Sequence, residues 1–230
     1  MISKPNFLGG QKLFYRHEIF QRKHEPSSPS RRSSREFPKG TQEVGCRFLL
    51  KNSPLKAHRL ADYKYLCIMK ILLLSDTHSH LDDFIIKYIN QADEVWHAGD
   101  IGDLKVTDQI ATLKPLRAVY GNIDDGQARM QFPLNNRFIC EGMDIWITHI
   151  GGYPGRYNQR VRSEIYNNPP DLFICGHSHI LKVINDKKIN CLHMNPGAIG
   201  MHGFHKKRTM LRFEINDGKI SNLEVIEKDR

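Results

Sequence analysis

The chain has 230 residues, of which 40% are hydrophobic, and this is enough to bury the core of one ordinary globular domain. The formal net charge of +9 lies within residues 1–68, because basic and acidic side chains balance from Met69 onward. The balanced part has no overall positive field that would attract nucleic acid, so we expect no nucleic-acid partner for it.

The sequence also argues against membrane, secreted and disulfide-rich classes. No apolar run approaches the roughly 18 residues that a membrane-spanning helix needs. The N-terminus shows no apolar segment followed by a small-residue cleavage site, and the five cysteines are widely and irregularly spaced. We therefore expect a cytoplasmic protein with no disulfide scaffold and no zinc finger.

Residues 1–68 are expected to form a basic, mostly disordered extension. Residues 26–40 are rich in Ser, Pro and Arg and cannot bury enough apolar surface to offset the entropy lost on ordering. Two interpretations stay open: a tail that binds an acidic partner or carries a targeting signal, or a segment upstream of the natural start. The second would place the start at Met69, where the predicted domain of residues 69–230 begins.

Strands and helices are predicted to alternate in the first half of this domain. Continuous apolar runs predict three strands, at Lys70–Leu74, Glu94–His97 and Leu116–Tyr120. Apolar residues at helical spacing predict one helix between Leu81 and Ala92, with Ser79 as its N-cap, and another over Asp103–Leu113. This alternation is typical of a parallel sheet with crossover helices.

The second half is predicted to be richer in strands. Short strands are expected at Phe138–Cys140, Asp144–Thr148, Leu172–Cys175, Lys182–Asn185 and Asn190–His193. One helix is expected over Arg156–Tyr166. Asp217-Gly218 predicts a tight hairpin between strands at Thr209–Asn216 and Lys219–Ile226.

Metal-capable side chains follow five of the predicted strands, where ligand sites form in open α/β sheets. In chain order they are Asp76, His78, Asp100, Asn122, His149, His177 and His179. A carboxylate can bridge two divalent cations about 4 Å apart, while imidazoles and an amide oxygen can fill terminal positions. Glycines before Asp100, Asn122 and His177 allow the sharp backbone turns that bring these side chains together. The sequence therefore predicts a two-metal site.

This pattern resembles the calcineurin-like metallophosphoesterase superfamily, and most of all its small single-domain phosphodiesterase branch of bacteria and archaea. The motifs Asp76-x-His78, Gly99-Asp100, Gly121-Asn122, His149 and Gly176-His177-x-His179 carry the resemblance, which covers about residues 69–230. It implies an α/β, four-layer αββα sandwich, in which two mixed β-sheets are flanked by helices.

The resemblance also implies the ligand set and the reaction. Asp76, His78 and His179 would bind one divalent metal ion, Asn122, His149 and His177 would bind a second, and Asp100 would bridge them. A hydroxide bridging the two ions would attack the phosphorus of a small phosphate ester, so Asp100, Asn122 and His177 are the predicted catalytic residues. The mixed N and O ligands suit Mn, Zn, Fe or Ni, and we expect manganese.

Two positions depart from the family pattern. Many members carry a His directly after the motif Asn, thought to assist the leaving group, but Ile123 stands here. Loss of a general acid costs about 10²–10⁴-fold in rate, so we expect modest activity and a preference for leaving groups that need little protonation. His149 is followed by Ile150 where the family often has Gly-His, so the second ion is expected to bind more weakly.

Substrate contacts are expected from the loop after His149 and from Asp124. Arg156 could clamp a phosphate, although a solvated loop with a surface arginine is an equal alternative, and Arg160 is a weaker candidate. Asp124 could partly replace the missing His. His97 is expected to pack beneath the site, and Lys206–Arg208 is expected to be a solvated edge.

Two other functions stay open beside the phosphodiesterase. The same fold serves as a scaffold subunit of the retromer coat, where the metal site is degraded, so an interaction module is the alternative from another class. The complete ligand set favours catalysis. A phosphomonoesterase or nucleotidase differs only in the loops around the site. A homodimer is left open as the assembly state.

Overall fold

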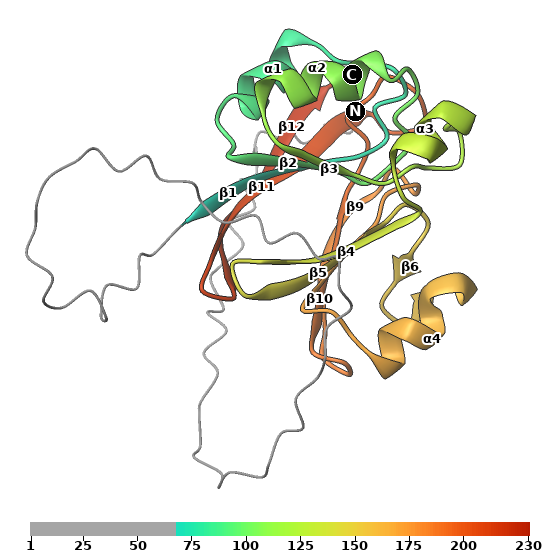
Figure 1. Ribbon diagram of the computed structural model, residues 1–230, viewed down its shortest axis with the longest axis vertical. Coiled ribbons are helices and arrows are strands. Elements are labelled where there is room, and N and C mark those ends of the chain that lie inside the picture. Colours follow the sequence, from blue (N-terminus) through green and yellow to red (C-terminus); the bar gives the residue numbers. More distant parts are fainter. Residues whose placement is uncertain (1–67) are drawn as a thin grey trace, which may run out of the picture. The chain divides into compact units, whose positions relative to one another are not determined.

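The computed structural model describes residues 68–230 of the chain (Figure 1). The predicted basic extension lies outside these residues, except for Ile68, and its interpretation stays a prediction. Within the described range, no helix combines the length and the hydrophobicity of a membrane span.

Two five-stranded sheets form the centre of the domain. The first contains β1 (Met69–Leu74), β2 (Glu94–His97), β3 (Leu116–Ala118), β11 (Lys207–Asn216) and β12 (Lys219–Asp229), in the order β12-β11-β1-β2-β3. The second contains β4 (Asn135–Cys140), β5 (Met143–Thr148), β8 (Leu172–Ile174), β9 (Leu181–Asp186) and β10 (Cys191–Pro196), in the order β4-β5-β8-β10-β9. A separate two-stranded ribbon pairs β6 (Gly152–Tyr153) with β7 (Arg156–Tyr157).

Both sheets are mixed, as the family resemblance implies. In the first sheet β1, β2 and β3 are parallel, and β11 and β12 extend it in antiparallel fashion. In the second sheet β5, β8 and β10 are parallel, and β4 and β9 flank them antiparallel. Parallel neighbours end on the same edge of a sheet, so the loops that follow these strands gather there.

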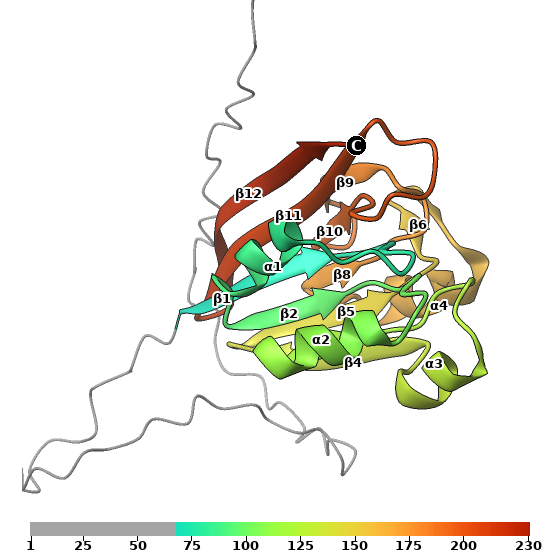
Figure 2. The same ribbon diagram turned by 90° about the horizontal axis from the view of Figure 1, so that it is seen from above.

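Helices cover the outer faces of the two sheets. They are α1 (Asp83–Ile89), α2 (Lys105–Leu113) and α4 (Gln159–Asn167), and a fourth helix, α3 (Gly126–Gln131), lies in the segment between β3 and β4. Figure 1 shows α1 and α2 on the side of the first sheet that faces away from the second, and α4 beyond the second sheet. Figure 2 looks onto α1 and α2, with β5 and β8 of the second sheet beneath the first. The predicted four-layer αββα sandwich is confirmed.

Each pair of neighbouring layers encloses its own hydrophobic cluster. Between the sheets, the fully buried Trp96 packs edge-on against Phe138 and Phe213, with ring centroids 5.3 and 5.7 Å apart. A second cluster joins the first sheet to α1 and α2, and a third joins the second sheet to α4. Burial of this apolar surface is the main force that holds the four layers together.

Several local predictions were wrong at element boundaries. Helix α1 begins after Asp82, whose side chain accepts a hydrogen bond from the Ile85 N–H at 3.1 Å. Ser79 does not cap this helix, because it has a φ of +68° and its hydroxyl accepts the Asp103 N–H at 2.9 Å. Helix α4 begins at Gln159, because Arg156–Tyr157 pair with β6. Helix α3 and the β6–β7 ribbon were not predicted.

Arg208 corrects another expectation, that residues 206–208 form a solvated edge. Its side chain is 3% exposed. The Nε atom donates to the Ile199 carbonyl at 2.7 Å, and Nη1 donates to Asp82 Oδ2 at 2.9 Å. This guanidinium therefore joins the loop that precedes β11 to the first turn of α1.

The ion pair between Asp82 and Arg208 should stabilise the fold at neutral pH and lose this effect in acid. Burial alone would raise the pKa of Asp82, but hydrogen bonds from Arg208 and from the Ile85 N–H hold it well below its usual range. Because the pKa of Asp82 is lower in the folded state, its charge stabilises the folded protein at pH values above the unfolded-state pKa of about 3.9. This stabilisation is lost as the pH falls from that value toward the folded-state pKa.

We expect Asp82→Asn to lower the free energy of unfolding at pH 7 by about 1–3 kcal/mol, because asparagine retains the cap but not the charge. Urea unfolding followed by circular dichroism at pH 7 and pH 3.5 measures the difference, which should shrink at the lower pH. Asp108→Asn, at an exposed position of α2, is the control. A difference independent of pH would show that the charge is not responsible.

Candidate metal centre

The loops after five strands bring the seven predicted ligands to one edge of the sandwich. Those that follow strands of the first sheet are Asp76, His78, Asp100 and Asn122, and those that follow strands of the second are His149, His177 and His179. Backbone hydrogen bonds tie the loops together: the Asp76 N–H donates to the Gly99 carbonyl at 2.9 Å, and the Gly176 N–H to the His149 carbonyl at 3.0 Å. The site therefore lies across both sheets.

Five of these seven residues have a left-handed backbone. Their φ angles are +55° at Asp76, +46° at His78, +55° at Asp100, +68° at His177 and +57° at His179. Side chains other than glycine seldom adopt this region, and such strain concentrates at functional sites, where the surrounding structure imposes it. The loops thus hold an unfavourable backbone in order to aim these side chains inward.

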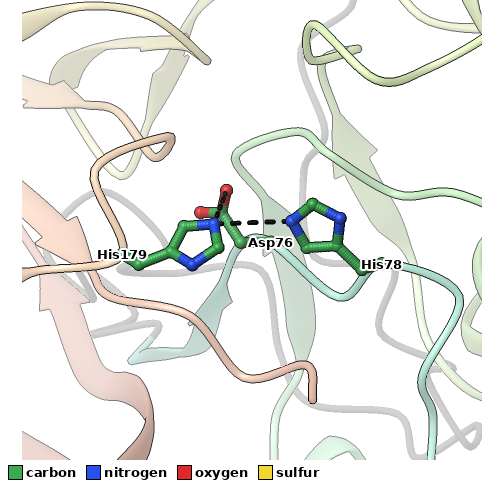
Figure 3. A group of neighbouring side chains, drawn as sticks. All are labelled: Asp76, His78 and His179. Carbon is green, nitrogen blue, oxygen red and sulfur yellow. Dashed lines mark hydrogen bonds and ion pairs between the residues drawn. The ribbon is translucent and has the colours of Figure 1, made fainter. Parts of the chain in front are cut away.

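Asp76, His78 and His179 form a first group in which the side chains point toward one another (Figure 3). His179 Nε2 lies 3.2 Å from Asp76 Oδ1 and 3.4 Å from His78 Nε2. Asp76 is fully buried, and its Oδ2 accepts the His177 N–H at 3.1 Å. One potential ligand atom from each residue lies within 4.8 Å of the other two.

Asp100, His149 and His177 form a second group of the same kind, and Asn122 lies beside it. His149 Nε2 is 3.1 Å from Asp100 Oδ1 and 3.1 Å from Asn122 Oδ1. The other oxygen of Asp100, Oδ2, is 3.7 Å from His78 Nε2 in the first group. Asp100 therefore presents one carboxylate oxygen to each group.

The donor atoms around His149 fit a cation. Its Nδ1 lies 2.8 Å from the Ala98 carbonyl, which can only accept, so Nδ1 carries the proton of the neutral ring. The unprotonated Nε2 then faces two oxygen atoms, from Asp100 and Asn122. Three converging lone pairs repel one another unless a proton or a metal ion lies among them.

The charges nearby act in the same direction. Burial opposes protonation of His149, but the hydrogen bond to Asp100 and the Asp76 carboxylate raise the pKa of His149 above its ordinary value. Burial lowers the pKa of His78, which keeps that ring neutral, as a metal ligand must be. Asp76 Oδ1 is buried and accepts no hydrogen bond within residues 68–230. The site thus contains acceptor atoms that lack a hydrogen-bond donor, and such atoms favour the binding of a cation.

His97 supports the loops from below, as predicted. It is fully buried, its Nδ1 accepts the Gly99 N–H at 3.1 Å, and its Nε2 lies 2.9 Å from Thr77 Oγ1. Burial lowers the pKa of His97 to about 4, so the ring is neutral at physiological pH. The two bonds fix the segments that carry Asp76 and Asp100.

Asp124 has a different role from the predicted substrate contact. It is 2% exposed, and its carboxylate accepts backbone N–H groups from Gly121 at 2.7 Å, Gly102 at 2.8 Å and Ile101 at 3.2 Å. These bonds join the loop after β2 to the loop after β3. The carboxylate is occupied in holding the backbone around Asp100 and Asn122, so it is not free to meet a substrate.

Arg160, the weaker of the two arginine candidates from the sequence, lies closer to the site than Arg156 does. Arg156 lies exposed in β7, and within the described part of the chain its side chain bonds to neither group. Arg160 of α4 donates to Thr148 Oγ1 at 2.7 Å and to the Ile150 carbonyl at 3.2 Å, on either side of His149. Sequence spacing gave no sign of this, because it depends on where α4 packs against β5.

The segment before β11 completes the surroundings of the first group. Asn195 donates to the Gly176 carbonyl at 2.8 Å and to Ser178 Oγ at 3.1 Å, so it contacts the loop that carries His177 and His179. The ring of His202 is 4.8 Å from that of His78, and the ring of His205 is 5.4 Å from that of His179. Both histidines therefore border the site.

Comparisons with known proteins agree with this geometry. A family model described as a calcineurin-like phosphoesterase superfamily domain matches residues 69–218. A probable metallophosphoesterase of Methanothermobacter thermautotrophicus is 26% identical over 137 residues, which cover 56% of this chain and 77% of that protein. A second, from Methanocaldococcus jannaschii, is 29% identical over 138 residues, covering 56% of this chain and 68% of that protein.

Solved structures share the fold at low sequence identity. One described as a novel archaeal phosphodiesterase has a TM-score of 0.54 and 23% identity, covering 69% of this chain and all of that one. Wild-type Vps29 of Entamoeba histolytica, complexed with Zn²⁺, has a TM-score of 0.55 and 17% identity, covering 70% of this chain and 99% of that one. At such identities these two matches show the architecture alone.

Proposed function

The chain belongs to the calcineurin-like phosphoesterase superfamily, and on this premise we propose that it is a metal-dependent phosphodiesterase that uses two divalent cations. The observation that carries the proposal is the position of Asp100, which offers one carboxylate oxygen to each of two ligand groups. We place the catalytic domain at residues 69–230, whose start coincides with that of the family match.

Each residue of the site has a proposed role in holding the cations. Asp76, His78 and His179 hold one, Asn122, His149 and His177 hold the other, and Asp100 contributes to both. Nitrogen and oxygen donors of this kind suit manganese, and also zinc, iron or nickel. When bound, such ions lower the pKa of a coordinated water and neutralise charge on phosphoryl oxygens. No side chain of the chain is needed as a nucleophile.

The leaving group receives little help from the protein. Ile123 is 46% exposed beside Asn122 and has no proton to give, and the carboxylate of Asp124 is occupied by backbone N–H groups. Catalysis without a general acid loses about 10²–10⁴-fold for poor leaving groups. The enzyme should therefore favour small phosphate esters whose leaving groups depart as stable anions.

Metal restoration tests this function. We expect the full-length chain, stripped with a chelator, to be inactive and to regain turnover with Mn²⁺ more than with Mg²⁺. Bis(p-nitrophenyl) phosphate, a diester, should be hydrolysed faster than p-nitrophenyl phosphate, a monoester. Titration calorimetry should give two ions per chain and fewer in His179→Ala. His80→Ala alters a histidine that belongs to neither group and whose Nε2 lies 3.4 Å from Asp82 Oδ2; it is the matched control and should remain active.

Each alternative function predicts another result. A phosphomonoesterase would prefer the monoester. An interaction module on this fold would bind no metal with useful affinity and would hydrolyse neither ester, and that outcome would overturn the proposal.

A further inference from the structure

A small pocket opens beside the second ligand group. Its volume is about 170 Å³, and Asn122 and His149 form part of its wall. Leu134 and Ile150 contribute apolar surface, and the lining also contains Tyr120, Arg129 and Arg160. A phosphate ester held at the proposed metal centre would thus have one ester arm next to this pocket.

Three hydrogen bonds hold Arg160 at the pocket wall. Its Nη1 donates to Asn135 Oδ1 at 2.9 Å, and its Nη2 donates to Thr148 Oγ1 at 2.7 Å and to the Ile150 carbonyl at 3.2 Å. All three acceptors are uncharged, so the positive charge of the guanidinium is not neutralised. Its Nε–H and the second N–H of Nη1 donate to no residue among 68–230, which leaves two donors for a ligand.

Arg129 supplies a second cation to the same pocket. Its Nε donates to the Asp124 carbonyl at 2.9 Å, and its guanidinium lies over the Tyr120 ring, 5.3 Å from the ring centroid. Stacking on an aromatic ring orients a guanidinium before any ligand arrives, which reduces the entropy lost on binding. Its Nη1 also has no partner in the described residues.

The absence of acidic partners distinguishes these two arginines from others. Most other bonded arginines of the described chain pair with a carboxylate, as in Arg117–Glu94, Arg137–Asp144, Arg208–Asp82 and Arg212–Glu224. Within residues 68–230 neither Arg129 nor Arg160 forms an ion pair. Two uncompensated and oriented guanidinium groups in one pocket are suited to bind an anion.

We infer that the pocket receives an ester arm carrying a second anionic group, so that the preferred substrates are phosphate esters with an additional carboxylate or phosphate. This inference rests on the proposed function, because the metal centre places the arm. An apolar cavity of about 150 Å³ holds one benzene ring, so the pocket has room for a single ring or a short chain with its anionic group.

Matched chromogenic substrates test the inference in the manganese-loaded, full-length protein. The first is methyl p-nitrophenyl phosphate, and the other two carry a carboxylate or a phosphonate on the nitrophenyl ring. The readout is the ratio of kcat/KM for an anionic probe to that for the uncharged probe. Comparing this ratio between variants cancels the intrinsic reactivity of each leaving group.

We expect the ratio to fall about tenfold or more when Arg129→Gln and Arg160→Gln are combined, and less in each single variant, with the change mainly in KM. Arg160→Lys should retain part of the preference. Arg162→Gln alters an exposed arginine of the same helix that forms no side-chain hydrogen bond or ion pair within residues 68–230, and it should keep both the ratio and the activity of the parent. The carboxylate and phosphonate probes show which anion fits better.

Binding of the free product, a carboxylated nitrophenol, gives a readout without turnover. Calorimetry should show affinity at least about tenfold higher for the parent than for the double variant. An unchanged ratio and unchanged affinity in the double variant, with thermal melting showing it folded, would overturn the inference and leave the phosphodiesterase intact. Loss of turnover of all probes in the parent, with product binding retained, would instead contradict the proposed function alone.

Discussion

Asp100→Asn should abolish metal-dependent turnover while the protein remains folded. Asparagine preserves the shape of the side chain, and its amide oxygen can still accept the Ile123 N–H, which lies 3.1 Å from Asp100 Oδ1. It cannot offer two negatively charged oxygens, one toward His149 and one toward His78. We expect kcat/KM for the diester to fall at least about 10³-fold, which equals about 4 kcal/mol of transition-state stabilisation.

The metal-binding readout separates this effect from a loss of structure. Calorimetry should show fewer than two bound ions per chain, whereas the metal-free melting temperature should change little. Asp108→Asn is the charge-matched control, because Asp108 is exposed on α2 and belongs to neither ligand group. If Asp100→Asn retained two ions and more than a tenth of the activity, Asp100 would not be shared between two cations.

Gly121→Ala should cause the second large loss of activity, although no functional group is removed. A Cβ added at Gly121 would lie 2.0 Å from Asp100 Oδ1 and 2.3 Å from the Asp100 nitrogen, so the Asp100 carboxylate or its loop must move. A displacement of about 1 Å at a reacting centre can cost about 10²-fold in rate, and we expect a loss of this size or more.

Gly126→Ala is a matched control only five residues away. Among the described residues, no atom outside the neighbouring backbone lies within 4 Å of a Cβ built at Gly126, and this residue is in α3, where alanine is the better helix former. The kcat/KM of this variant should stay close to that of the parent. If the two alanine variants had equal activity with the same diester, the prediction would be wrong, because the loop at Gly121 would have accommodated the methyl group without displacing Asp100.

The sequence predicted the ligands of the site well, but it did not predict the roles of the residues around them. Strand-end positions and preceding glycines were sufficient to select the side chains that the structure brings into two groups, because strand direction alone determines where loops gather. The roles of Asp124 and Arg160 depend on contacts between segments far apart in the chain. Asp124 was expected to contact the substrate, and only the three backbone N–H groups that donate to its carboxylate show that it anchors the loops.

The elements that were not predicted lack a periodic signal. Helix α3 spans six residues with only one buried side chain, and β6 and β7 span two residues each, which is too short for a hydrophobic pattern. Arg208 was misplaced for a related reason. Neighbouring lysines suggested a solvated edge, whereas the partner that draws its guanidinium inward, Asp82, lies 126 positions away in the sequence.

The division of the ligands between the two sheets has a consequence for the whole domain. Asp76, His78, Asp100 and Asn122 belong to one sheet, and the three remaining histidines belong to the other. Any ion bound by both sets would therefore act as a cross-link between the halves of the sandwich. A ligand present at 100 times its dissociation constant adds about 2.7 kcal/mol to the stability of the state that binds it. Depletion of metal would then weaken the cohesion of this edge of the fold as well as its chemistry, and the lifetime of the protein would depend on metal supply.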